Sequence, residues 1–330
     1  MPPDNPQSYV EGVLARDRRM LAKTITLIES ALPDHQKLAR TIIDQLLPHT
    51  GEAVRLGITG VPGVGKSTFI ESLGTLLVKK GHRVGVLAVD PSSKRSGGSV
   101  LADKTRMEKL SVEEKAFIRP SPSGGTLGGV AKKTRETIIA CEAAGFDVMI
   151  VETVGVGQSE TTVASMVDFF LVLMISGAGD ELQGIKKGIL ELADAVAVNK
   201  ADGDNIERAN IARKQYETAM HFLAPSSPNW TPPVLTCSAL EMTGINRIWD
   251  TVLEHRKRLT ASGELQANRQ KQAVDWMWSL VKEGLRERFY ENTEVKKRLA
   301  DIIKAVENGS TAPTVAANQL LFFLDNTSHV

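Results

Sequence analysis

The stretch Gly60-Val61-Pro62-Gly63-Val64-Gly65-Lys66-Ser67 matches the phosphate-binding pattern GxxxxGK[ST]. A short apolar run, Val54 to Thr59, comes directly before it, and a helical pattern runs from Lys66 to Lys80. A strand, a glycine-rich loop and a helix in this order are the context that the pattern requires. We therefore predict a P-loop, in which backbone N–H groups and the positive end of the helix hold the phosphates of a nucleotide.

The residues of this motif have separate expected roles. Lys66 is expected to reach the β- and γ-phosphates, Ser67 to place its hydroxyl on Mg2+, and Thr68 to contact the α-phosphate. The remaining nucleotide contacts of the loop are expected from Gly60, Pro62, Gly63, Val64 and Gly65. Kinases, ATPases and GTPases share this loop, so it names neither the base nor the reaction.

Five more short apolar runs show little polar alternation, which is typical of strands buried on both faces. They are Val84 to Val89, Val148 to Val151, Phe169 to Ile175, Ala195 to Val198 and Val234 to Thr236. Helical stretches separate most of them, at Leu127 to Ala144, Gly184 to Leu192, Asn205 to Phe222 and Ile245 to Leu259. This alternation predicts an α/β P-loop NTPase fold with a mostly parallel, doubly wound sheet. The segment from Asp90 to Phe117 is expected to be a long active-site connection.

Helical segments are expected on both sides of this core. Between Ser8 and Pro48 the apolar spacing predicts two amphipathic helices separated at Pro33, and the tail from Leu265 to Phe323 is also helical in pattern. We predict an N-terminal helical segment (1–50), a P-loop domain (51–262) and a C-terminal helical arm (263–330). The arm either packs on its own domain or forms a dimer contact.

Composition excludes several classes of partner. Forty Lys and Arg residues against thirty-nine Asp and Glu give a net charge of +1, so no global charge favours nucleic acid or an anionic membrane. No apolar run approaches the roughly 20 residues that span a bilayer, and a cytoplasmic protein is expected. Cys141 and Cys237 lie in apolar contexts and are expected to be buried, reduced thiols.

Two predicted strands end in acids, Asp90 and Glu152. Carboxylates at the carboxyl ends of parallel strands project into the ligand crevice. Glu152-Thr153-Val154-Gly155 resembles the end of a Walker-B strand, where the acid holds Mg2+ and the glycine N–H meets the γ-phosphate. Asp103 is a third candidate carboxylate, although a solvated loop acid fits its spacing equally well. The expected magnesium ligands are Ser67, Asp90, Asp103 and Glu152.

The residues from Gly155 to Glu160 form a glycine-rich, polar run that could order around a γ-phosphate and relax on its loss. Gln158 lies three residues after Gly155 rather than next to it, so no water-positioning group is named and slow intrinsic hydrolysis is expected. Lys186, in the charged Gly177 to Lys187 loop, is a candidate for electrostatic help; an exposed loop is the alternative. The expected catalytic residues are Lys66, Glu152 and Lys186.

Asn199-Lys200-Ala201-Asp202 follows a predicted buried strand, where the fold presents ligand contacts. The Asp202 carboxylate can accept from guanine N1–H and the exocyclic amine together, whereas adenine lacks this donor pair. Asn199 and the stem of Lys200 are expected to frame the purine. Ser238-Ala239-Leu240 resembles the loop whose backbone N–H contacts guanine O6. Together, these motifs predict binding of GTP and GDP with Mg2+.

Further stretches complete a likeness to one family. They are Val89-Asp90-Pro91-Ser92-Ser93, Gly97-Gly98-Ser99, Asp103-Lys104-Thr105-Arg106-Met107, Glu152 to Glu160 and Gly177 to Lys187. With the P-loop and base motifs, they resemble the methylmalonyl-CoA mutase-associated GTPases, the MeaB/ArgK family. The likeness is densest from Val54 to Leu240 and includes the helical flanks.

The resemblance implies a homodimeric GTPase that acts as a chaperone for an adenosylcobalamin-dependent mutase, gating cofactor delivery and protecting the enzyme from inactivation. It also implies that Asp90, Asp103 and Glu152 surround Mg2+, that the loop with Asp180, Glu181 and Lys186 responds to the mutase, and that the tail beyond Ser262 makes the dimer contact. An older family name leaves a protein kinase or phosphotransferase linked to an amino-acid transport system as the alternative function. A nucleotide-gated scaffold whose hydrolysis only resets it is a third.

Overall fold

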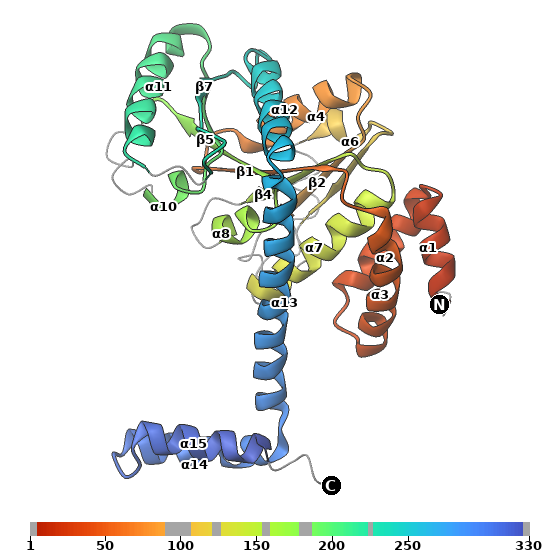
Figure 1. Cartoon of the computed structure of the whole chain (residues 1–330), viewed down its shortest axis with the longest axis vertical. Helices are drawn as coiled ribbons and strands as arrows, with labels where there is room; N and C mark the ends of the chain where they lie inside the picture. The colour runs from red at the N-terminus through yellow and green to blue at the C-terminus, as the bar shows by residue number, and fades with distance from the viewer. Residues whose placement is uncertain are drawn as a thin grey trace. The chain divides into compact units, whose positions relative to one another are not determined.

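The computed structural model describes residues 5–89, 107–120, 127–153, 159–177, 187–223 and 227–325. The chain divides into two compact units, Met1–Gln270 and Lys271–Val330, and the boundary lies within helix α13 (Glu264–Glu291). The first unit contains the sheet and the helices around it (Figure 1). The second contains the rest of α13 with α14 (Thr293–Glu307) and α15 (Pro313–Asp325).

The described residues form a seven-stranded sheet with the order β3-β2-β4-β1-β5-β6-β7, and every pair of neighbouring strands is parallel. The strands are β1 (Val54–Gly60), β2 (Val84–Val89), β3 (Ala116–Arg119), β4 (Val148–Thr153), β5 (Phe169–Ile175), β6 (Ala195–Asn199) and β7 (Val234–Thr236). The strand that enters the P-loop lies at the centre, between β4 and β5. The predicted parallel α/β fold is confirmed.

Helices cover both faces of the sheet. They are α4 (Lys66–Lys79), α6 (Glu108–Ser111), α7 (Leu127–Ala143), α8 (Ser159–Ala164), α10 (Lys187–Leu190), α11 (Ile206–His221) and α12 (Ile245–Ala261). Side chains of α4, α6 and α12 share one core with the sheet, while α7 and α8 pack on β1, β2 and β4 from the other face. The sheet is therefore doubly wound, as predicted.

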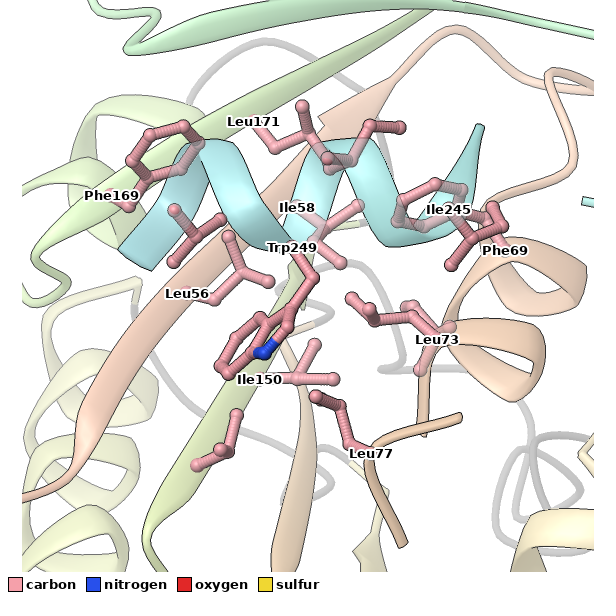
Figure 2. Close-up of a cluster of buried hydrophobic side chains, with 14 of the residues drawn as sticks. Leu56, Ile58, Phe69, Leu73, Leu77, Ile150, Phe169, Leu171, Ile245 and Trp249 are labelled. Atoms are coloured by element: carbon pink, nitrogen blue, oxygen red, sulfur yellow. The ribbon is translucent and has the colours of Figure 1, made fainter. Parts of the chain in front are cut away.

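The main core fills the space between the sheet and α4 with α12 (Figure 2). Trp249 of α12 is 1% exposed and lies among Leu56 and Ile150 of the sheet and Leu77 of α4. Burying an aromatic or branched side chain of this size contributes about 1.5–3 kcal/mol. This packing fixes α4, and with it the loop that precedes α4, against the central strands.

Two short features differ from the sequence prediction. Helix α6 lies within the segment that was expected to be a connection up to Phe117, and strand β3 begins at Ala116, near the end of that segment. Strand β3 has only four residues, lies at the edge of the sheet and is flanked by charged residues, so its apolar pattern is too short to stand out. The predicted connection therefore contains a helix and the start of a strand that the sequence did not indicate.

The N-terminal segment contains three helices, α1 (Pro6–Leu14), α2 (Arg18–Glu29) and α3 (Pro33–Leu46), rather than two. The extra break falls at Arg16, whose φ is 63°, and at Asp17, whose carboxylate accepts hydrogen bonds from the N–H groups of Arg19 and Met20. Such an N-cap ends one helical pattern and starts the next without interrupting the apolar spacing. The break at Pro33 is confirmed.

Charged side chains join the amino ends of β1 and β5 to the start of α13. Arg269 donates to both carboxylate oxygens of Asp168 at 2.7 Å and to the carbonyl oxygen of Ala53 at 2.7 Å. The Asp168 carboxylate also accepts from the Arg55 N–H, and the Arg55 side chain contacts Glu142. Because the Asp168 and Glu142 side chains are at most 5% exposed, these contacts hold charges that water does not reach.

Among the described helices, none is long and apolar enough to cross a membrane. Cys141 and Cys237 are both free and buried, as predicted. Burial raises the pKa of the Cys237 thiol to about 12, so it stays protonated and inert at neutral pH.

Candidate nucleotide-binding site

The loop between β1 and α4 has the backbone that its glycines predict. Gly60 ends β1, and a Cβ there would lie 2.5 Å from the carbonyl oxygen of Leu173 on β5. Gly65 precedes α4 with a φ of +92°, a left-handed conformation that favours glycine. Pro62 and Gly63 are exposed, whereas Val64 is fully buried and anchors the loop. The helix begins at Lys66, as predicted, so its first N–H groups lie beside the loop.

Lys66 lies folded back over this loop. Its Nζ donates to the carbonyl oxygens of Gly60 at 2.8 Å and Val61 at 3.3 Å. Partial burial lowers the pKa of Lys66, while the charges of Glu152 and Glu160 act in the opposite direction and raise it. Two carbonyls are weak partners for an ammonium compared with an anion, so the side chain is available for a phosphate.

Ser67 and Glu152 bring two oxygen donors together at the ends of neighbouring elements. The Ser67 hydroxyl lies 3.5 Å from a carboxylate oxygen of Glu152, which is the fifth residue of β4. The register of β1 with β4 pairs Ile58 with Glu152, and the Thr153 hydroxyl donates to that of Thr59 at 2.7 Å. A hydroxyl beside a carboxylate is the hard-oxygen chemistry that Mg2+ prefers, so this half of the predicted metal set fits the ion.

Asp90 and Asp103, the other two predicted magnesium ligands, lie outside the described residues. Gly155, Lys186 and Gln158 also lie outside them. Within the described ranges, no three His, Cys, Asp or Glu side chains gather as a metal-binding group. The predicted roles of Asp90, Asp103, Gly155 and Lys186 therefore stay predictions.

Asn199 joins the phosphate loop to the base loop. Its side chain is 1% exposed, and its Nδ2 donates to the carbonyl oxygen of Val64 at 2.8 Å. Its Oδ1 accepts from the Ala239 N–H at 3.0 Å and lies 3.5 Å from the Cys237 sulfur. The residue that was expected to frame the purine thus also holds two loops from distant parts of the sequence against each other.

Asp202 and Ser238 lie together at the carboxyl ends of β6 and β7. The Ser238 hydroxyl donates to the Asp202 carboxylate and accepts from the Glu241 N–H at 3.1 Å. Lys200 is exposed, with a φ of 60°, and its carbonyl oxygen accepts from Asn205 at 2.6 Å. The two predicted base motifs therefore meet, and Asn199 connects them to the predicted phosphate motif.

Two residues near the site were not selected from the sequence. Glu160, which was expected in a flexible run with Ser159, lies in the first turn of α8 and is 1% exposed, and its charge acts on Lys66. Ser72 of α4 contacts the base loop, because its hydroxyl donates to the carbonyl oxygen of Ala239 at 2.6 Å. Ser72 belongs to no local motif, and the run that contains Glu160 gives it no individual role, so only the three-dimensional arrangement identifies the two residues.

A family model described as methylmalonyl Co-A mutase-associated GTPase MeaB matches residues 21–294. The chain belongs to the MeaB family. The match covers the sheet, both nucleotide motifs and the start of α14, so the resemblance predicted from the motifs is confirmed. This MeaB-family chain is a P-loop GTPase.

Relatives of the MeaB-family chain carry GTPase names. A putative GTPase of Caulobacter vibrioides is 56% identical, with 95% of this chain and 96% of the relative covered. The GTPase ArgK of Escherichia coli is 49% identical over 93% of each chain. A mouse protein named methylmalonic aciduria type A homolog, mitochondrial, is 44% identical, with 96% of this chain and 80% of the relative covered.

A solved structure shares the architecture over nearly the whole chain. It is described as a LAO/AO transport system kinase, is 42% identical and has a TM-score of 0.79, with 97% of this chain and 98% of the other covered. The family description refers to methylmalonyl-CoA mutase, and the mouse relative's name refers to methylmalonic aciduria. The description of the solved structure refers to a transport-system kinase. The chain is thus a GTPase of a family that is described as associated with methylmalonyl-CoA mutase.

Proposed function

We propose that this MeaB-family chain binds GTP with Mg2+ across the P-loop and the Asn199–Asp202 motif, hydrolyses it slowly, and uses the cycle to act on an adenosylcobalamin-dependent mutase. The observation that supports this most directly is the pair of hydrogen bonds by which the Asn199 side chain holds Val64 of the phosphate loop and Ala239 of the base loop. A nucleotide that bridges these loops would find both ends of its site positioned in advance, which lowers the cost of binding.

In this proposal, the phosphates lie on the backbone of Gly60 to Gly65 and at the N-terminus of α4. Lys66 exchanges its two carbonyl partners for the β- and γ-phosphates, and Thr68, exposed on the first turn, contacts the α-phosphate. Charge that develops on the transferred phosphoryl group is stabilised by the Lys66 ammonium, the main electrostatic contribution that this chain's described residues make.

Ser67 and Glu152 would hold Mg2+, which supplies charge neutralisation between the β- and γ-phosphates when bound. Their 3.5 Å separation supports this assignment. We further propose Asp90 and Asp103 as ligands, Gly155 as the γ-phosphate contact and Lys186 as a source of electrostatic help, on the basis of their sequence motifs. Hydrolysis is expected to be slow without a partner because no residue is identified that would orient the attacking water.

Guanine is read by Asp202, with Asn199, Lys200 and the Ser238 to Leu240 loop around it. The Ser238 hydroxyl on the Asp202 carboxylate supports this, because it holds the carboxylate in one orientation. Guanine N1–H and N2–H together complement a carboxylate, and adenine would not supply this pair of donors to it, at a cost of about 1–3 kcal/mol or more.

The partner is proposed from the family. Its description names methylmalonyl-CoA mutase and the mouse relative's name refers to methylmalonic aciduria, which supports a mutase as the partner. We propose that the chain acts on this enzyme as a chaperone that gates cobalamin loading and protects it from inactivation. We also propose a homodimer through an arm at residues 263–330, beside an N-terminal segment at 1–50 and a GTPase domain at 51–262. Exposed apolar side chains on α13, including Met277 and Trp278, support that contact. The cytoplasmic location stays a prediction.

A pull-down tests the partner. The purified chain, loaded with either GDP or a non-hydrolysable GTP analogue, is incubated with cell extract, and the retained proteins are identified. Retention of a cobalamin-dependent mutase that differs between the two nucleotide states supports the proposal, and equal or absent retention contradicts it. Incubation with γ-labelled GTP separates the kinase alternative: labelled phosphate in solution indicates a GTPase, and labelled protein indicates a phosphotransferase.

A further inference from the structure

Ser72 connects the helix that follows the phosphate loop to the loop that is proposed to read the base. It lies in the second turn of α4, five residues after Ser67. A serine within a helix often bonds its hydroxyl to the carbonyl four residues earlier. The Ser72 hydroxyl instead donates to the carbonyl oxygen of Ala239 at 2.6 Å, across 167 positions of sequence. This contact is partly buried, so water competes with it only in part.

The Ala239 residue is thereby held on both sides. Its N–H donates to the Asn199 Oδ1 at 3.0 Å, its carbonyl accepts from Ser72, and the residue is 4% exposed. The carbonyl of Ala239 and the N–H of Leu240 belong to one planar, trans peptide unit and point in opposite directions. Because Ser72 draws the carbonyl towards α4, it turns the Leu240 N–H away from α4.

The Leu240 N–H is available to a ligand. It donates no hydrogen bond to any residue that the structure describes, and the Leu240 side chain is 80% exposed. The neighbouring Ala239 N–H, by contrast, is already used by Asn199. Ser238, the residue before Ala239, contacts the Asp202 carboxylate, so a free donor and a fixed acceptor lie on the same loop cluster.

We propose that Ser72 is a positioning residue for recognition of the purine 6-carbonyl oxygen, acting through the Ala239–Leu240 peptide. The proposal rests on the guanine site proposed above. A free N–H beside a carboxylate complements an oxygen at C6 next to a protonated N1, as in guanine and hypoxanthine. It does not complement the amino group at C6 of adenine.

The test compares nucleotides that differ only in the base, using the full chain. GDP and IDP both carry the 6-carbonyl oxygen, and IDP lacks the 2-amino group. The diphosphate of 2-aminopurine riboside keeps the 2-amino group and lacks the oxygen. Ser72→Ala is expected to weaken GDP and IDP equally, each by about fivefold, as for one lost orienting hydrogen bond, and to leave the 2-aminopurine nucleotide unchanged. Ser72→Thr keeps the hydroxyl and is expected to restore GDP affinity.

Several outcomes overturn the inference. An equal loss for all three nucleotides would mean that Ser72 only supports the fold, and no loss for GDP would mean that it does not act on the base at all. If the wild-type chain does not prefer GDP to ADP, the proposed guanine site itself fails. A wild-type preference that Ser72→Ala leaves intact removes only the role of Ser72.

The proposed role of the Leu240 N–H can also be tested in the wild-type chain. Hydrogen exchange of the Leu240 amide should slow when GDP or IDP binds and should not slow with the 2-aminopurine nucleotide, because only the first two offer an acceptor. Equal protection by all three nucleotides would contradict the inference.

Discussion

The amide nitrogen of the Asn199 side chain lies 2.8 Å from the carbonyl oxygen of Val64, a residue 135 positions earlier in the chain. Through this contact and the 3.0 Å bond from the Ala239 N–H to Asn199 Oδ1, one buried side chain sets the separation between the phosphate loop and the base loop. The site therefore depends on the strand order β1-β5-β6 in the sheet as much as on its motifs.

Asn199→Asp should weaken GDP binding by about tenfold or more. The carboxylate keeps the shape of the side chain but loses the N–H donor, and it places negative charge beside the Val64 carbonyl oxygen in a buried position. Equilibrium titration with a fluorescent GDP measures the loss. Asn229→Ala is the matched control, because this amide lies in the segment before β7 and contacts Glu264 instead. Unchanged affinity in Asn199→Asp would show that the two loops are not coupled through this side chain.

Lys66→Ala should lower GTP affinity by about 100-fold while leaving the melting temperature of the nucleotide-free chain nearly unchanged. The described contacts of the Lys66 ammonium are two partly buried backbone carbonyls at the start of the loop, so its loss removes little folding free energy but a full charge opposite the phosphates. Calorimetric titration with GTP and Mg2+ provides the affinity, and Lys66→Arg controls for charge. Tight GTP binding by the alanine variant would disprove the assigned role.

Asp202→Asn should change the preferred base of the bound nucleotide from guanine to xanthine. An asparagine offers one acceptor and one donor, which complement the N1–H and the 2-carbonyl oxygen of xanthine, whereas it leaves one guanine donor unpaired. We expect GDP affinity to fall by about 100-fold and XDP affinity to rise, as measured by competition for one fluorescent nucleotide. A variant that loses GDP without gaining XDP would point to a structural role for Asp202, through its bond to Ser238.

Arg269→Ala should destabilise the chain by about 3–5 kcal/mol, because it leaves the buried Asp168 carboxylate without its ion-pair partner. Urea unfolding measures the change. Arg213→Ala breaks an exposed ion pair with Glu217 one helical turn away and should cost at most about 0.5 kcal/mol. Similar losses in the two variants would mean that the Arg269 contacts contribute no more than a surface pair.

The raised pKa of the Asp194 carboxyl predicts that the stability of the folded chain depends on pH. Burial raises the pKa of its carboxyl to about 7, above the usual range, and its Oδ1 lies 3.7 Å from the Nε2 of His255, whose pKa burial lowers to about 4. A carboxyl with a raised pKa stabilises the folded state while protonated, and this stability is lost as pH rises from about 4 to 7. The Phe170 N–H bond and the nearby Asp168 and Glu264 are the other groups that act on this carboxyl.

Asp194→Asn removes that titration and keeps an acceptor for Phe170. Its free energy of unfolding should exceed that of the wild type by about 4 kcal/mol at pH 8, because the wild type loses about 1.4 kcal/mol for each pH unit between about 4 and 7, and the difference should disappear towards pH 4. His255 acts in the opposite sense in both proteins, since the unfolded chain binds its proton more readily below about pH 6.5. A difference that grows towards low pH would contradict the raised pKa.

The fold could be predicted where local patterns are long enough. Spacing within the P-loop and six apolar runs identified the central strands, and the glycine positions matched a backbone that excludes a Cβ at Gly60. Strand β3 was missed because four residues at a sheet edge leave no periodic pattern. The break between α1 and α2 was missed because Asp17, a visible N-cap signal, lies within continuous apolar spacing.

The site could be predicted as a set of motifs but not as an arrangement. The sequence indicates that Asn199 follows a strand; it does not indicate that the side chain bonds Val64, because that contact depends on strand order. Ser72 belongs to no motif, and Glu160 lies in a motif that assigns it no individual role; the importance of both comes from what the fold places opposite them.

The central claim is that one pocket holds the triphosphate on the P-loop and selects guanine through Asp202. Calorimetric titration of the wild-type chain with GTP and with ATP, each with Mg2+, tests it most directly. We predict one bound GTP per chain and an affinity for ATP lower by about 100-fold or more. Equal affinities for the two nucleotides, or no heat with GTP, would contradict it.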